Sequence, residues 1–168
     1  MDAATAHRFL ERLFDADGDT PPIDWDRFRL MQLIPGTAGA PDAHTRDQLV
    51  ARGFVEIAKG SFDAETERRS LSSLRALFQQ IIGADYKLVA YDNPMLEALR
   101  IGPAPGAPAN LARLLSAVAD IAAHAEAVTI RSDGDVLGER LMTLMFVDGK
   151  YVGFLPGRRE VAAGTGRA

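Results

Sequence analysis

The chain contains no cysteine, few lysines and no long apolar run. The missing cysteine excludes disulfide bonds, thiolate catalysis and cysteine-ligated zinc. No stretch approaches the roughly 20 apolar residues that a membrane-spanning helix needs, and the first residues do not pair a basic region with an apolar run. We therefore expect a cytoplasmic protein that does not bind membranes.

Charge and composition further narrow the class of protein to which the chain can belong. The net charge of −4 and the pI of about 5.4 argue against nucleic-acid binding, because such domains carry a strongly basic face. Only Lys59, Lys87 and Lys150 are lysines among 19 basic residues, and with the many alanines this is typical of a bacterial-like composition. A chain of this length can bury roughly 70% of its surface. We expect one domain over 1–157 and a flexible tail over 158–168, where apolar periodicity ends.

The strongest local signal is a β-hairpin over 141–155. Asp148-Gly149 suits a type I′ turn, so Phe146 should face Tyr151 and Thr143 should face Phe154. Neither face of this hairpin is polar. One face should carry Met142, Leu144, Phe146, Tyr151 and Leu155, and the other Leu141, Met145, Val152 and Phe154. A hairpin that is apolar on both sides belongs in a covered sheet, so we expect it to be central and its strand over 151–155 to be buried.

The remaining pattern indicates an α+β fold with a mixed or antiparallel sheet. Two long amphipathic helices, over 64–82 and 108–124, should pack on the hairpin. Shorter elements are a helix over 3–14, a helix over 43–52 and strands over 54–58, 86–91 and 127–131. Two segments stay open between helix and strand: 25–34, where a helix is favoured, and 95–101.

An acidic loop over 15–26 is the first candidate site. It holds five aspartates and no basic residue: Asp15, Asp17, Asp19, Asp24 and Asp26. Such a loop can meet a partner protein with a basic surface. The spacing of Asp15, Asp17, Asp19 and Asp26 also resembles an EF-hand calcium loop, but the sixth position is Thr20 instead of glycine. We expect a partner-binding loop and no metal, with calcium as the alternative.

A polar loop over 131–140 is the second candidate site. Its charged residues are Arg131, Asp133, Asp135, Glu139 and Arg140. Carboxylates beside arginine can perform acid and base chemistry where burial separates their pKa values. The candidate catalytic residues are His124, which lies nearby in the sequence, and Arg131, Asp133, Asp135 and Arg140.

The sequence as a whole favours a binding protein without catalysis. No motif for a cofactor or a catalytic nucleophile is present, while apolar residues are abundant. An inhibitor, immunity protein, chaperone or adaptor would have this pattern, binding a protein, a ligand or a second copy through the sheet. The alternative is a small enzyme or ligand-binding domain that uses the loop over 131–140.

Overall fold

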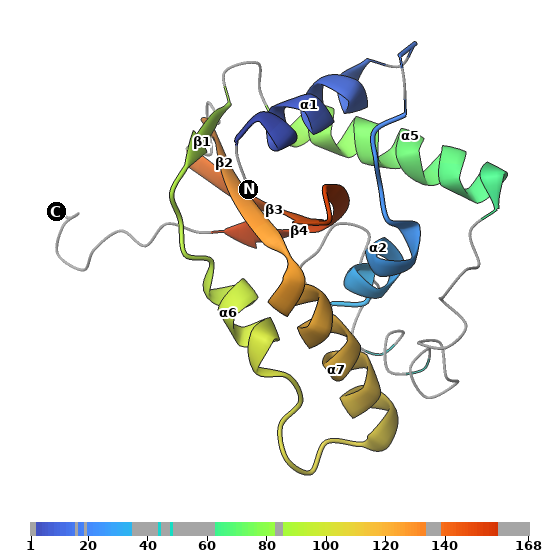
Figure 1. The fold of residues 1–168 in the computed structure, drawn as a ribbon, viewed down its shortest axis with the longest axis vertical. Coiled ribbons are helices and arrows are strands. Elements are labelled where there is room, and N and C mark those ends of the chain that lie inside the picture. Colours follow the sequence, from blue (N-terminus) through green and yellow to red (C-terminus); the bar gives the residue numbers. More distant parts are fainter. Residues whose placement is uncertain are drawn as a thin grey trace, which may run out of the picture.

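The computed structural model describes residues 3–15, 17–18, 20–34, 44, 48, 63–82, 86–133 and 139–157. The elements, in chain order, are α1 (Ala3–Phe14), α2 (Trp25–Gln32), α5 (Ala64–Ile81), β1 (Lys87–Val89), α6 (Pro94–Ile101), α7 (Ala109–His124), β2 (Glu126–Asp133), β3 (Glu139–Val147) and β4 (Lys150–Gly157) (Figure 1). The α+β class is confirmed. The predicted tail over 158–168 and strand over 54–58 lie outside the described residues, as does the helix over 43–52 except for the helical residues 44 and 48.

The first ambiguous segment, 25–34, is helical over α2. Asp24 has an extended backbone, and its side chain accepts a hydrogen bond from the backbone N–H of Arg27 at 3.2 Å. This bond satisfies one of the N–H groups that a helix start leaves unpaired. The cap therefore selects helix where the apolar pattern alone fits both structures.

The second ambiguous segment, 95–101, is also helical. Asn93 accepts a hydrogen bond from the backbone N–H of Met95 at 2.9 Å, and Pro94 occupies the start of α6. The Asn93 amide also donates to the hydroxyl of Thr143 at 2.9 Å, and this hydroxyl lies 2.8 Å from that of Thr129. A buried polar network thus fixes the start of α6 on β2 and β3.

The sheet is antiparallel throughout, with the order β1-β2-β3-β4. The burial predicted for 151–155 is confirmed, since Tyr151, Val152 and Leu155 are fully buried. The predicted central position is wrong for β4, which is the last strand of the sheet. A parallel bridge between Ile23 and Tyr151 covers the outer edge of β4 at one point. β4 is therefore a buried edge strand, although no long strand among the described residues pairs with this edge.

The hairpin turn is as predicted, but the register changes after two residue pairs. Asp148 and Gly149 both have positive φ, of 52° and 78°, and Phe146 pairs with Tyr151. A β-bulge then adds Val152, so that Thr143 faces Leu155 instead of Phe154. One extra residue reverses the faces of the residues that follow. Phe154 and Leu155 consequently lie on the opposite faces from those predicted.

Helices cover both faces of the sheet (Figure 1). On one face α1 and α5 pack with Phe28 of α2 onto Met142, Leu144, Phe146, Tyr151 and Phe154. On the other face α6, α7 and the end of α2 pack onto Met145, Val147, Val152 and Leu155. The two long helices thus take opposite faces, and a homodimer formed through the sheet would have to use an edge. No helix in the described part of the chain is long and apolar enough to span a membrane.

Candidate functional site

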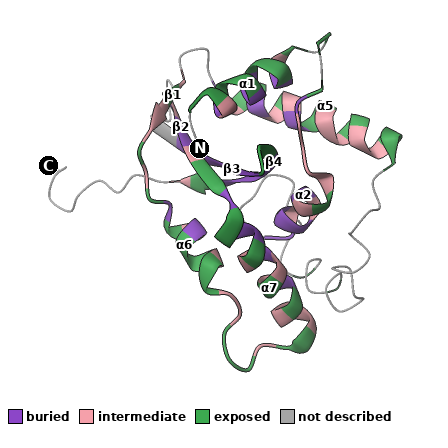
Figure 2. Ribbon diagram, viewed as in Figure 1, coloured by how far each residue is buried: buried purple, intermediate pink, exposed green. Residues whose placement is uncertain are grey.

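A pocket of about 640 Å³ lies between α2, α5 and β4. Its described lining is Phe28, Met31, Gln32, Thr66, Arg69, Ser70, Ser73, Leu74, Leu77, Tyr151, Gly153 and Phe154. Figure 2 shows α5 with exposed and half-buried residues along much of its length. Because Arg69 and Ser73 are exposed, the pocket opens to solvent along α5. Its volume is in the range of small-ligand sites, roughly 300–1,000 Å³.

The bulge of β4 shapes the wall that this strand shares with α2. Gly153 follows Val152 with φ of 147°, a conformation that residues with a side chain rarely adopt. A Cβ atom at Gly153 would lie only 3.2 Å from the Cβ of Met31. Glycine here therefore lets α2 pack directly on β4, and both sides of the contact line the pocket.

Tyr151 lies at the centre of an aromatic cluster beside the pocket. Its ring stacks on Phe9 with centroids 4.6 Å apart. Phe28, Phe78 and Phe146 surround the ring at centroid distances of 6.0, 6.1 and 6.0 Å. Rings from α1, α2, α5 and β3 thus fix the position of Tyr151.

The hydroxyl of Tyr151 is the exceptional polar group of this region. The residue is fully buried, and its hydroxyl oxygen has no hydrogen-bond partner among the described residues. Burial raises the pKa of Tyr151 well above its ordinary value, because the phenolate would lose its hydration. The hydroxyl is therefore neutral, and it keeps a proton that it can donate.

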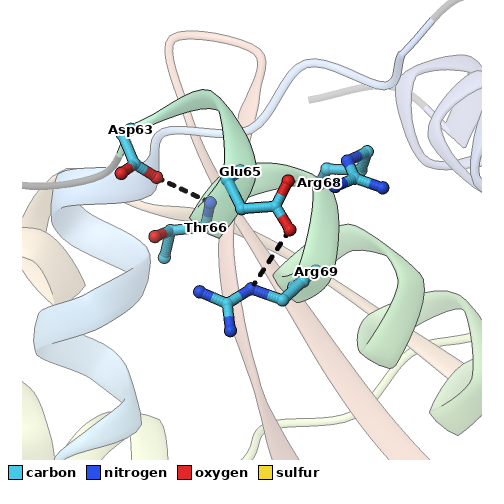
Figure 3. Close-up of polar contacts among 5 residues, drawn as sticks. All are labelled: Asp63, Glu65, Thr66, Arg68 and Arg69. Carbon is cyan, nitrogen blue, oxygen red and sulfur yellow. Dashed lines mark hydrogen bonds and ion pairs between the residues drawn. The ribbon is translucent and has the colours of Figure 1, made fainter.

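The polar rim of the pocket comes mainly from one face of α5. Four polar residues of the lining follow one another at spacings of three, one and three residues, which places them on one side of the helix. They are Thr66, Arg69, Ser70 and Ser73. Asp63 begins this helix by accepting a hydrogen bond from the backbone N–H of Thr66 at 2.8 Å (Figure 3). That bond lowers the pKa of Asp63.

Arg69 is the single charged residue in the described lining. Its Nε lies 3.8 Å from Oε1 of Glu65, near the outer limit of an ion pair (Figure 3). The other carboxylate oxygen of Glu65 pairs with Arg68. One carboxylate is thus shared by two guanidinium groups, and the carboxylate of Asp63 also interacts electrostatically with Arg69.

A second pocket, of about 400 Å³, adjoins the same arginine on the other side of α5. Its described lining is Gly18, Thr20, Arg68, Arg69, Leu71, Ser72 and Arg75. Arg75 also donates from Nε to the backbone carbonyl of Leu13. Three arginines therefore line the second pocket, and one of them, Arg69, lines both.

The structure gives local roles to part of the predicted acidic loop. Asp24 caps α2 and pairs with Arg27, and Asp15 accepts a hydrogen bond from the backbone N–H of Asp17 at 3.1 Å. Asp26 lies in the first turn of α2, and Asp19 lies outside the described residues. The described residues contain no group of three His, Asp or Glu side chains that could hold a metal ion. Whether this loop binds a partner stays a prediction.

The structure separates His124 from the loop over 131–140. His124 ends α7, just before β2, and the loop follows β2 at its far end. A strand of eight residues places these ends roughly 23 Å apart. His124 is exposed, and its Nδ1 lies 2.8 Å from the carbonyl oxygen of Asp120. Arg131 lies in β2 opposite Leu141, Asp133 and Arg140 are in strand backbone, and Asp135 lies outside the described residues.

The pocket was not predicted from the sequence, although part of its signal is present there. The apolar stripe of α5 is evident, and hydroxyl and guanidinium side chains lie beside it. Their spacing over 66–73 predicts one polar line along the border of that stripe. The contribution of β4 depends on tertiary contacts and has no local signal.

Comparison of the chain with family models, curated proteins and solved structures finds no match.

Proposed function

We propose that the protein is a non-catalytic binding protein that holds a small, largely apolar ligand between α2, α5 and β4. The observation that carries the proposal is the pocket itself, of about 640 Å³, whose described lining is largely apolar and carries its one charged side chain, Arg69, at the rim.

The lining also supports binding over catalysis. Its described residues include no histidine, aspartate, glutamate or lysine, so the usual proton-transferring side chains are missing from the described wall. Apolar side chains with a few polar groups are typical of ligand pockets. The cytoplasmic location and a protein partner for the acidic loop remain predictions from the sequence.

Titration calorimetry with decanoate, decanol and decylamine tests the proposal. At least one of these amphiphiles should bind saturably with one ligand per chain. Emission from Trp25 should change with binding, since its ring contacts the pocket residue Phe28 at a centroid distance of 5.5 Å. Failure of all three to bind would refute a pocket for apolar ligands.

A matched pair of variants locates the binding. Ser73→Phe adds an aromatic ring at the rim of the pocket and should abolish binding. Ser72→Phe adds the same ring at the adjacent exposed position of α5, which lines the second pocket instead. Equal effects of both variants would place the ligand elsewhere.

A further inference from the structure

Building on the proposed function, we infer that the ligand is an amphiphile with an apolar body and one carboxylate, and that Arg69 binds this carboxylate. The apolar body would lie against Phe28, Leu74 and Leu77, which line the pocket. The headgroup would lie at the solvent-exposed rim on α5. Such a ligand matches both the apolar wall and the charge of the rim.

Arg69 has donors available for this contact. Its ion pair with Glu65 uses Nε, and its two Nη groups make no hydrogen bond or ion pair with the described residues. A guanidinium presents parallel N–H donors that match the two oxygens of a carboxylate. The hydroxyls of Ser70 and Ser73 lie one and four residues further along α5 and also line the pocket, so they can add neutral donors at the same rim.

Arginine is the only charged residue type in the described lining of either pocket, which favours a negative ligand over a positive one. Arg68 and Arg75 line the second pocket together with Arg69, and the nearby Glu65 already pairs with Arg68. A cationic headgroup would meet this arginine cluster directly. A neutral headgroup would gain the burial of its chain without an ionic contact.

The ligand series separates this inference from the proposed function. Decanoate should bind about tenfold more tightly than decanol, because a hydrogen bond to a charged group adds more than a neutral one. Decylamine should bind more weakly than decanol. Raising the salt concentration should weaken decanoate binding and leave decanol binding unchanged, since the exposed contact is screened.

Two arginine variants identify the residue. Arg69→Gln should reduce decanoate affinity about five- to tenfold and leave decanol affinity within twofold. The lower value of this range allows for solvent screening, because the Arg69 side chain is 70% exposed. Arg69→Lys should lose less, because the charge remains while the planar pair of donors is lost. Arg68→Gln, a change of the neighbouring arginine that also pairs with Glu65, should change neither affinity by more than twofold.

Each outcome decides between the two proposals. Equal binding of decanoate and decanol, blocked by Ser73→Phe, would overturn the carboxylate inference and support the pocket. Equal losses in Arg69→Gln and Arg68→Gln would overturn the role of Arg69 in favour of general surface charge. Urea unfolding of every variant, compared with the parent chain, shows whether a lost affinity reflects a lost fold.

Discussion

Phe9 of α1 stacks on Tyr151 of β4 with ring centroids 4.6 Å apart and ring planes 19° apart. The stack joins the N-terminal helix to the last strand of the sheet, and it confines the tyrosine within an aromatic cluster. A side chain that is held in this way cannot turn its hydroxyl to water without opening the core. The missing partner of this hydroxyl among the described residues therefore has consequences for stability.

Tyr151→Phe should stabilise the free protein by about 1 kcal/mol, because it removes a buried hydroxyl that has no partner among the described residues. Urea unfolding measures this effect. Tyr86→Phe is the control, since its hydroxyl lies 3.0 Å from Nδ1 of His7 at an exposed position and its loss should not stabilise the chain. Destabilisation by Tyr151→Phe would show that the hydroxyl is paired.

The raised pKa of Tyr151 predicts a loss of stability at alkaline pH. In the unfolded chain this phenol ionises near pH 10, whereas burial keeps it protonated in the folded chain to a much higher pH. The contribution of the neutral phenol is full below about pH 10 and falls as the pH rises further, with a limiting slope of about 1.4 kcal/mol per unit. When unfolding free energies are measured from about pH 8 to 11, the difference between Tyr151→Phe and the parent chain should therefore be constant at first and widen only at the alkaline end.

Local signals account for the parts of the fold that the sequence predicted. Asp148-Gly149 specifies its turn through backbone conformation, and Asp63 specifies the start of α5 through one hydrogen bond. Asn93-Pro94 carried a similar start signal for α6, which the apolar pattern of 95–101 obscured. Signals of this kind act within four residues, so they can be read without knowledge of the fold.

Long-range contacts account for the parts that the sequence did not predict. The bulge at Val152 accompanies the close approach of Gly153 to Met31, which lies far away in the chain. The pocket likewise needs α2, α5 and β4 together, and its tyrosine is held by rings from four elements. Polar residues such as Ser73 have no special meaning on an isolated helix. Their role as a rim depends on the elements that face them.

Gly153→Ala should destabilise the fold by roughly 1–3 kcal/mol, because alanine is strained at φ of 147° and its Cβ would press on Met31. Gly149→Ala is the matched control, with φ of 78° and open space around the added methyl group. It should cost less, since the left-handed region is only moderately unfavourable for alanine. Urea unfolding of both variants measures the difference. A smaller cost at Gly153 than at Gly149 would contradict the close packing of α2 on β4.

Asp24→Ala should cost about 1 kcal/mol of stability through loss of the cap of α2. Asp24→Asn should cost less, since asparagine caps helices about as well as aspartate. Asp17→Ala, an exposed change in the same loop, should leave stability unchanged. Thermal unfolding of the three variants tests whether Asp24 acts by capping. A cost for Asp24→Asn as large as that for Asp24→Ala would point instead to its charge, which pairs with Arg27.

The length of the ligand's apolar body gives a test of the pocket that does not depend on the headgroup. Each methylene removed from water contributes about 0.8 kcal/mol, so octanoate should bind roughly tenfold more weakly than decanoate. The same step between octanol and decanol should have the same size, because the chain and the headgroup contact different walls. Leu77→Ala should reduce the step by removing apolar wall from the pocket. A step that is absent from both series would mean that the chain stays in water, which would contradict a ligand held between α2, α5 and β4.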